Sequence, residues 1–305
     1  MLLLTLGIWS SYGQSSIPGS EAAGRWDITI NTPNGNQPAW LEIEKSGISA
    51  LVGRFVGPGG SARPISEITY SPSDETYRFS IPPQWSSRDT DIEFEFTYDG
   101  DKLTGWTTDG EGKKLTWTAV PSPNLVRTEA PVWGEPIDLI DKELSAWQLA
   151  ENNEFTVENG VMINRKSGGN IRTKQKFDDF KLHLEFKYPE ASNSGVYLRG
   201  RYEVQIADNY GEEPESHFIG GIYGFIDPVV NAAHQANQWQ TYDITLIGRR
   251  VTVVLNGQTV IKDRPIPGIT GGAIDSNEGE PGPIMLQGDH GAISFRNMSI
   301  IPAAD

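Results

Sequence analysis

The chain has 305 residues, enough for two ordinary domains, and its 40 acidic against 25 basic residues give a formal net charge of −15. That charge disfavours nucleic acid and anionic membrane surfaces as partners. Cysteine is absent, which excludes disulfides, thiolate nucleophiles and thiolate metal sites. The 33 glycines and 20 prolines are typical of short strands joined by tight turns.

The N-terminal stretch, residues 1–16, is a short apolar run followed by small and polar residues. It resembles the back half of a secretory signal peptide without a basic n-region, and it is far shorter than the ~20 apolar residues that span a bilayer. We therefore expect an exported protein, periplasmic or extracellular, with no membrane span. The alternative is a disordered or packed N-terminal tail.

Residues 21–120 contain eight short alternating stretches, such as WDITI at 26–30 and WLEIE at 40–44, separated by turn residues. This pattern predicts a small all-β domain, a meandering antiparallel barrel or sandwich, whose role the sequence does not indicate. Residues 121–136 contain four prolines and little periodicity, and they are interpreted as a linker.

A second all-β unit is predicted for residues 137–305, where the stretch 193–211 combines strand formers with a polar face. In a strand, Tyr202, Val204 and Ile206 share one face while Glu203 and Gln205 share the other. A three-residue turn at Gly200–Arg201 would align Arg199 with Glu203, and a two-residue turn would oppose them. The sequence leaves both open.

Two features further along the chain also indicate function. Residues 209–239 form a long segment with little regular pattern, which is usually functional inside a compact domain. The apolar alternation slips between Phe295 and Met298, which predicts a bulge at 296–297 that would redirect the arginine.

The second unit carries six motifs in order: PIDLIDKELSAWQL, NSGVYLRG, YEVQIADN, GGIYG, QWQTYDITLIGRRVTVVLNG and PIMLQGDHGAISFRNMSI. Together they resemble the 3-keto-disaccharide hydrolase domain family, from about residue 131 to the C-terminus. The resemblance implies a jelly-roll β-sandwich of the concanavalin A-like lectin/glucanase type. It also implies a substrate class, glycosides already oxidised at C3 by a separate sugar 3-dehydrogenase.

A ketone at C3 acidifies the C2 proton, so that a base can remove it and the C1 oxygen can leave; water then adds to the enone. The family motifs point to particular residues for this elimination and hydration. The implied catalytic residues are Glu203, His290, Arg199 and Arg296, with either Glu203 or His290 as the base and the arginines at the enolate oxygen. The implied substrate-binding residues are Gln205, Tyr223, Gln287 and Asp208.

The resemblance leaves open a non-catalytic carbohydrate-binding module on the same fold, because a jelly roll hosts both activities. The presence of an acid–base pair favours the enzyme, and the missing carboxylate pair disfavours an ordinary glycosidase. We expect no organic cofactor and no transition metal, whereas oxygen ligands such as Asp289 could suit a divalent cation such as Ca²⁺. Asp289 could alternatively orient the imidazole of His290.

Overall fold

The computed structural model describes residues 17–83 and 88–304, so the expected signal peptide, residues 1–16, lies outside the described residues. Apart from one 3-10 turn, η1 (Ser20–Ala22), every regular element in this part of the chain is a strand. The all-β prediction is therefore confirmed. Within the same residues, no helix is long and apolar enough to cross a membrane.

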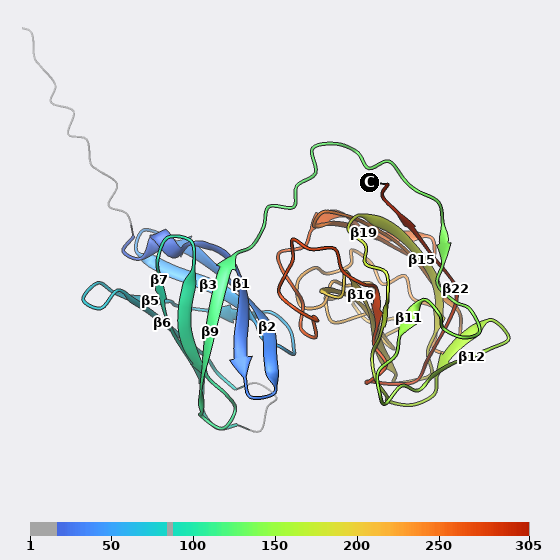
Figure 1. The fold of residues 1–305 in the computed structure, drawn as a ribbon, viewed down its shortest axis with the longest axis horizontal. Helices are drawn as coiled ribbons and strands as arrows, with labels where there is room; N and C mark the ends of the chain where they lie inside the picture. Colours follow the sequence, from blue (N-terminus) through green and yellow to red (C-terminus); the bar gives the residue numbers. More distant parts are fainter. Residues whose placement is uncertain (1–16, 84–87, 305) are drawn as a thin grey trace, which may run out of the picture.

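The first nine strands form one antiparallel meander in the order β4-β3-β2-β1-β9-β8-β7-β6-β5. The sheet curls into the barrel drawn in blue to green in Figure 1. Alternate side chains of each strand point into the barrel, where twenty buried hydrophobic residues form its core. The strands are β1 (Gly24–Thr32), β2 (Gly35–Ser46), β3 (Ala50–Val56), β4 (Arg63–Ile65), β5 (Thr69–Ser71), β6 (Thr76–Ile81), β7 (Ile92–Tyr98), β8 (Leu103–Thr108) and β9 (Lys114–Pro121).

The remaining strands form two antiparallel sheets. The eight-stranded sheet has the order β12-β13-β22-β15-β18-β19-β20, with β10 also paired to β22, and the five-stranded sheet has the order β11-β14-β21-β16-β17. The larger sheet comprises β10 (Ile137–Asp138), β12 (Phe155–Glu158), β13 (Val161–Asn164), β15 (Phe180–Lys187), β18 (Gln240–Ile247), β19 (Arg250–Leu255), β20 (Gln258–Pro265) and β22 (Ile293–Pro302). The smaller sheet comprises β11 (Trp147–Gln148), β14 (Ile171–Thr173), β16 (Asn193–Leu198), β17 (Tyr202–Ala207) and β21 (Met285–Leu286).

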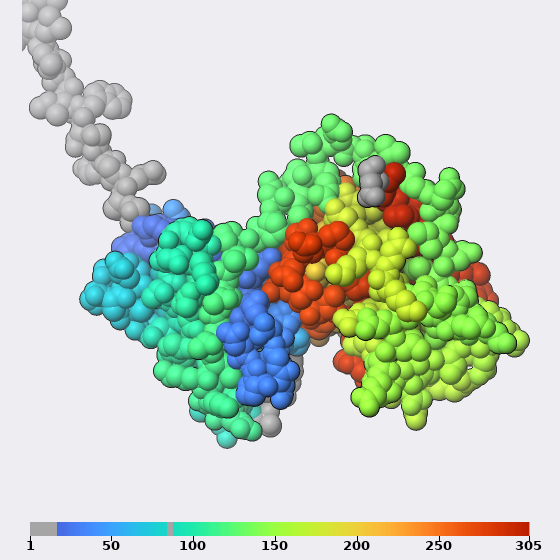
Figure 2. Space-filling model, in the orientation of Figure 1, coloured from blue at the N-terminus to red at the C-terminus, as the bar shows by residue number. Residues whose placement is uncertain are grey.

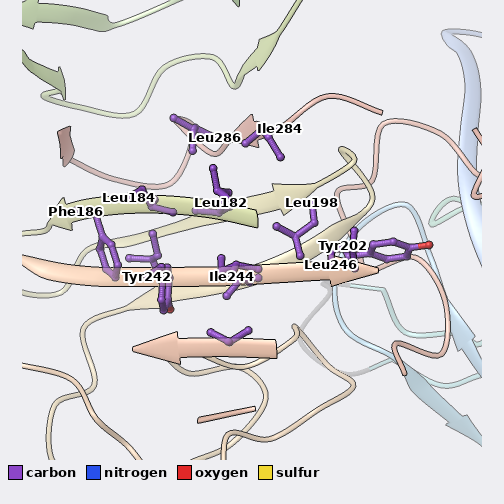
Figure 3. Packing of buried hydrophobic residues seen from close by; sticks show 14 of the residues in the cluster. Leu182, Leu184, Phe186, Leu198, Tyr202, Tyr242, Ile244, Leu246, Ile284 and Leu286 are labelled. Carbon is purple, nitrogen blue, oxygen red and sulfur yellow. The ribbon is translucent and has the colours of Figure 1, made fainter. Parts of the chain in front are cut away.

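The two sheets pack face to face and bury a common core, part of which Figure 3 shows. Leu182, Leu184 and Phe186 point inward from β15, and Leu198 and Leu286 face them from the smaller sheet. This inward set follows from strict alternation, since the polar residues between them on β15 are less buried. The architecture is the expected jelly-roll sandwich.

The barrel and the sandwich share part of their core. Trp40 and Val56 of the barrel are fully buried and belong to the hydrophobic cluster of the sandwich. The Trp40 ring lies edge-on to Phe225, with 5.4 Å between ring centroids, and a Cβ on Gly268 would meet it at 2.3 Å. Figure 2 shows the two bodies in contact beneath the linking segment. The barrel is therefore docked on the sandwich by an aromatic anchor.

Candidate active site

Glu203 lies on β17 directly opposite Tyr197 of β16, on the face of the smaller sheet that points away from the sandwich core. Its carboxylate accepts a hydrogen bond from the Tyr197 hydroxyl at 2.9 Å. The position opposite Gln205 in β16 is Gly195, where a Cβ would lie 2.2 Å from the Glu203 carboxylate. A glycine is therefore needed there to admit the acid.

Burial sets the charge state of this carboxyl group. Glu203 is 3% exposed, and the loss of solvent raises its pKa to about 8, with the Tyr197 hydrogen bond opposing the shift and the charge of Asp289 adding to it. Burial likewise raises the pKa of Tyr197 well above its ordinary value. At neutral pH the carboxyl group therefore holds its proton and can act as a donor.

The long irregular segment 209–239 runs along the free edge of β17 and places a tyrosine beside the acid. The backbone of Gln205 exchanges hydrogen bonds with Gly221 and Gly220, at 3.0 and 3.1 Å, and Tyr223 donates its N–H to the carbonyl oxygen of Glu203 at 3.1 Å. Tyr223 is half-buried, and burial followed by the charge of Glu203 raises its pKa. The segment thus supplies one side of the site.

The turn between β21 and β22 supplies the histidine. Asn164 holds this turn by donating to the carbonyl oxygens of Gly288 and Gly291, at 3.0 and 2.9 Å. Within it, Nδ1 of His290 lies 2.7 Å from the Asp289 carboxylate, and both side chains are about half exposed. An imidazole held this way at Nδ1 presents Nε2 to a ligand.

These groups surround one cavity of about 270 Å³, a volume suited to a single sugar ring. The cavity brings together five of the eight site residues expected from the sequence: Glu203, Gln205, Tyr223, Gln287 and His290. The Oε1 atom of Gln287 is buried and has no hydrogen-bond partner among the described residues, which leaves it available to a ligand hydroxyl. The sequence analysis missed Tyr197, although its alternation with the buried Val196 and Leu198 places it on the Glu203 face.

The barrel also contributes to the wall of the cavity. Gly59 and Gly60, in the loop after β3, line the cavity together with Gly271 and Gly272 of the sandwich. A Cβ on Gly271 would lie 2.1 Å from the carbonyl oxygen of Gly60, so the two backbones are in direct contact. No sequence pattern indicated that the N-terminal unit takes part in the site.

Arg199 does not reach the cavity. The turn after β16 has three residues, since Leu198 pairs with Tyr202, but Arg199 adopts a left-handed conformation with φ of 51°. Its guanidinium is fully buried and donates to Asp178 (2.7 Å), the Tyr202 hydroxyl and the carbonyl oxygen of Gly248. This corrects the expectation that a three-residue turn aligns Arg199 with Glu203, because the left-handed residue breaks the alternation of the strand.

Arg296 and Asp208 also lie outside the cavity. The bulge predicted at 296–297 is present, since Asn297 has a φ of 48° and the register of β22 with β15 shifts there. It directs Arg296 onto the outer face of the larger sheet, where the guanidinium pairs with Glu185 at 2.6 Å and stacks on Trp239. Asp208 accepts a hydrogen bond from the N–H of Ala191.

Among residues 17–83 and 88–304, no group of three or more histidine and carboxylate side chains is arranged to hold a metal ion. Within this part of the chain, the polar groups of the cavity are one carboxylic acid, one histidine–aspartate pair, tyrosine hydroxyls and amides. Such a set can transfer protons to and from a bound ligand and hold its hydroxyl groups. The composition of the cavity therefore suits proton transfer to and from a small polar molecule.

Comparison with known proteins places this site in a family. A profile of the family described as 3-keto-alpha-glucoside-1,2-lyase-like domain matches residues 133–301. This match covers more than half of the chain and includes every residue that the sandwich contributes to the cavity. The chain belongs to this family of carbohydrate-active domains. No curated protein matches it.

Several solved structures are similar to the chain. A protein of Parabacteroides distasonis, described provisionally as a glycosyl hydrolase, is 32% identical over 58% of this chain and 93% of its own, with a TM-score of 0.48. A second such protein of that organism is 26% identical over 55% of this chain and 98% of its own, with a TM-score of 0.45. A carbohydrate-binding module of Bacillus subtilis is 12% identical over 50% of this chain and 89% of its own, with a TM-score of 0.32.

Proposed function

We propose that the cavity cleaves glycosides that carry a ketone at C3 of the sugar, by eliminating the oxygen at C1. The observation that carries the proposal is the buried carboxyl group of Glu203, whose raised pKa keeps it protonated at neutral pH beside the His290–Asp289 pair. The family to which the chain belongs is named for a 1,2-lyase reaction on such sugars. A lectin site would need no acid–base pair of this kind.

In the proposed reaction, a base first removes the proton at C2, and the electron pair is delocalised onto the C3 oxygen as an enolate. The pair then forms the C1=C2 double bond while the C1–O bond breaks, and the leaving oxygen takes up a proton. The products are an enone and a free alcohol. Addition of water to the enone gives the 3-keto sugar and completes a formal hydrolysis.

His290 is the base in this scheme, because Asp289 holds its Nδ1 atom and would stabilise the imidazolium that forms. Glu203 is the acid that protonates the leaving oxygen, since burial keeps the proton on its carboxyl group. The unpartnered Oε1 of Gln287 accepts a hydrogen bond from a sugar hydroxyl, and Gln205 and Tyr223 provide further polar contacts.

The scheme uses no redox cofactor, because the ketone is already present in the substrate. A separate sugar 3-dehydrogenase must therefore supply it. Export to the periplasm or the cell exterior is proposed on the N-terminal sequence alone, and a bound divalent cation is not part of the scheme.

The test is to incubate the purified protein with a 3-keto-disaccharide and with its unoxidised parent, following enone absorbance and released monosaccharide. We expect cleavage of the keto sugar only. We also expect kcat/KM to fall as the pH rises through about 8, where Glu203 loses its proton. Glu203→Gln should lower kcat by about 100-fold or more and remove this alkaline limb.

The outcomes separate the alternatives. A rate that rises through about pH 8 would make Glu203 the base and exchange the two roles. Binding of either sugar with no turnover would support the non-catalytic carbohydrate-binding module and overturn the proposed function. Unchanged turnover in both Glu203→Gln and His290→Ala would remove this cavity as the catalytic site.

A further inference from the structure

The barrel contains a second and larger cavity, of about 510 Å³. It lies at the end of the barrel where β1, β3, β6 and β8 end, whereas aromatic side chains such as Trp117 and Tyr77 fill the interior towards the other end. Its apolar lining includes two rings and four aliphatic side chains: Phe55, Phe94, Ile30, Ile81, Ile92 and Leu115. A hollow with this lining suits an apolar ring system.

Two arginines give the same cavity a positive edge. Arg63 and Arg88 both line it, and both donate through Nη2 to the carbonyl oxygen of Pro82, so their guanidinium groups converge. Burial and the neighbouring charge of Arg88 lower the pKa of Arg63. In the described part of the chain, Arg63 donates to a carbonyl oxygen and forms no ion pair with a carboxylate. The carboxylate that lines the cavity, Asp109, accepts backbone N–H groups of its own turn. A carboxylate on a ligand could therefore pair with Arg63.

The barrel cavity adjoins the candidate active site. Gly59 and Gly60 line both cavities, so that one loop separates them. At these two positions the partition has no side chain, and a Cβ on Gly59 or Gly60 would meet nothing within 4 Å. At these positions the two cavities are therefore separated by backbone alone.

We propose that the barrel cavity holds the leaving group of the substrate, and that this leaving group is an aromatic ring carrying a carboxylate. The inference rests on the proposed function of the neighbouring cavity and narrows its substrate class to glycosides of phenolic acids. The sugar occupies the sandwich, the glycosidic oxygen lies at the loop, and the ring enters the barrel with its carboxylate toward Arg63.

The first experiment compares two 3-keto-glucosides of nearly the same size that differ in charge, the 4-carboxyphenyl and the 4-carbamoylphenyl compounds; the uncharged amide is the slightly better leaving group, so a preference for the carboxylate cannot come from leaving-group acidity. We expect kcat/KM of the wild type to favour the carboxylate by at least about tenfold. Arg63→Gln should abolish this preference. Arg250→Gln is the matched control, because this exposed arginine on β19 pairs with Asp263 away from both cavities, and it should retain the preference. Equal rates for both compounds in the wild type would overturn the inference.

The second experiment measures binding of 4-hydroxybenzoate, the released phenolic acid, by calorimetry and without turnover. We expect saturable binding to the wild type and at least about tenfold weaker binding to Arg63→Gln. Cleavage of 3-keto-glucosides with no binding of 4-hydroxybenzoate would overturn the inference and leave the lyase reaction in place. Binding without cleavage of any 3-keto-glucoside would instead overturn the proposed function, and with it the assignment of the cavity to a leaving group.

Discussion

The backbone N–H of Gly272 donates a hydrogen bond to the carbonyl oxygen of Pro58, 3.0 Å away, and so joins the sandwich to the barrel beside the candidate active site. The neighbouring contact between Gly271 and Gly60 is also made by backbone atoms. Because both contacts lack side chains, the position of the barrel loop depends on how closely the two backbone segments approach each other. The wall of the cavity is therefore sensitive to the smallest substitution at these glycines.

Gly271→Ala tests this dependence. The new Cβ would lie 2.1 Å from the Gly60 carbonyl oxygen, so the loop must move. We expect kcat/KM on a 3-keto-glycoside to fall by about 100-fold, since a displacement of about 1 Å in a site can cost this much. Gly279→Ala is the control, because its Cβ would meet Pro123 at an ordinary 3.6 Å. Equal rates in both variants would show that the loop does not position the substrate.

Glu203→Gln is expected to change the pH dependence of stability. The pKa of Glu203 is raised from 4.5 to about 8, so the folded state retains a proton that the unfolded state loses, and the free energy of unfolding declines as the pH rises between these values. The glutamine side chain of the variant does not ionise in this pH range. Chemical denaturation should therefore show that the free energy of unfolding of the variant rises relative to that of the wild type, by up to about 1.4 kcal/mol per pH unit from pH 4.5 to 8. A constant difference over this range would contradict the raised pKa.

Asp27→Asn is expected to make the docking of the barrel less dependent on pH. Asp27 of β1 is buried, and desolvation followed by the charge of Glu278 in the sandwich raises its pKa to about 7, while Arg249 opposes this shift. Docking should weaken as the pH rises from about 4 to 7, because the docked state holds the proton more tightly. Small-angle scattering at pH 5 and 8 would detect this loosening of the barrel in the wild type and in the exposed control Asp101→Asn, and a smaller change in Asp27→Asn. Identical scattering curves for the wild type at both pH values would refute the prediction.

The two arginines outside the cavity provide a paired test. Arg199→Gln leaves buried partners without their cation and should lower the free energy of unfolding by about 3 kcal/mol. Arg296→Gln removes a partly exposed ion pair and should cost less than about 1 kcal/mol. Thermal unfolding measures both. Loss of turnover in a well-folded Arg296→Gln protein would restore the enolate role that the family resemblance implied.

The sequence predicted the features that depend on neighbouring residues along one strand. Alternation in β17 places Glu203 and Gln205 on one polar face, and the slip in β22 corresponds to the observed bulge at Asn297. Both follow from the two-residue period of a strand. Alternation also predicted the all-β architecture, and in residues 17–83 and 88–304 every regular element except one 3-10 turn is a strand.

The features that the sequence did not predict depend on contacts between distant segments. The direction of Arg199 depends on a left-handed residue in a turn, and the carbonyl oxygen of Gly248, which accepts its hydrogen bond, is 49 positions away. The raised pKa of Glu203 depends on burial that only the assembled site provides. The side of the cavity formed by Gly59 and Gly60 exists only where the barrel meets the sandwich, and the periodicity of a single strand carries no information about that contact.

The burial of Trp40 in the sandwich core has a consequence for biosynthesis. The barrel leaves the ribosome before the sandwich is synthesised and, with its own core, can fold first. In the complete protein, Trp40 completes the hydrophobic cluster of the sandwich by packing against Gly268 and Phe225. A sandwich made without the N-terminal unit would therefore expose the apolar surface that Trp40 covers, including Phe225, and we expect it to aggregate more readily.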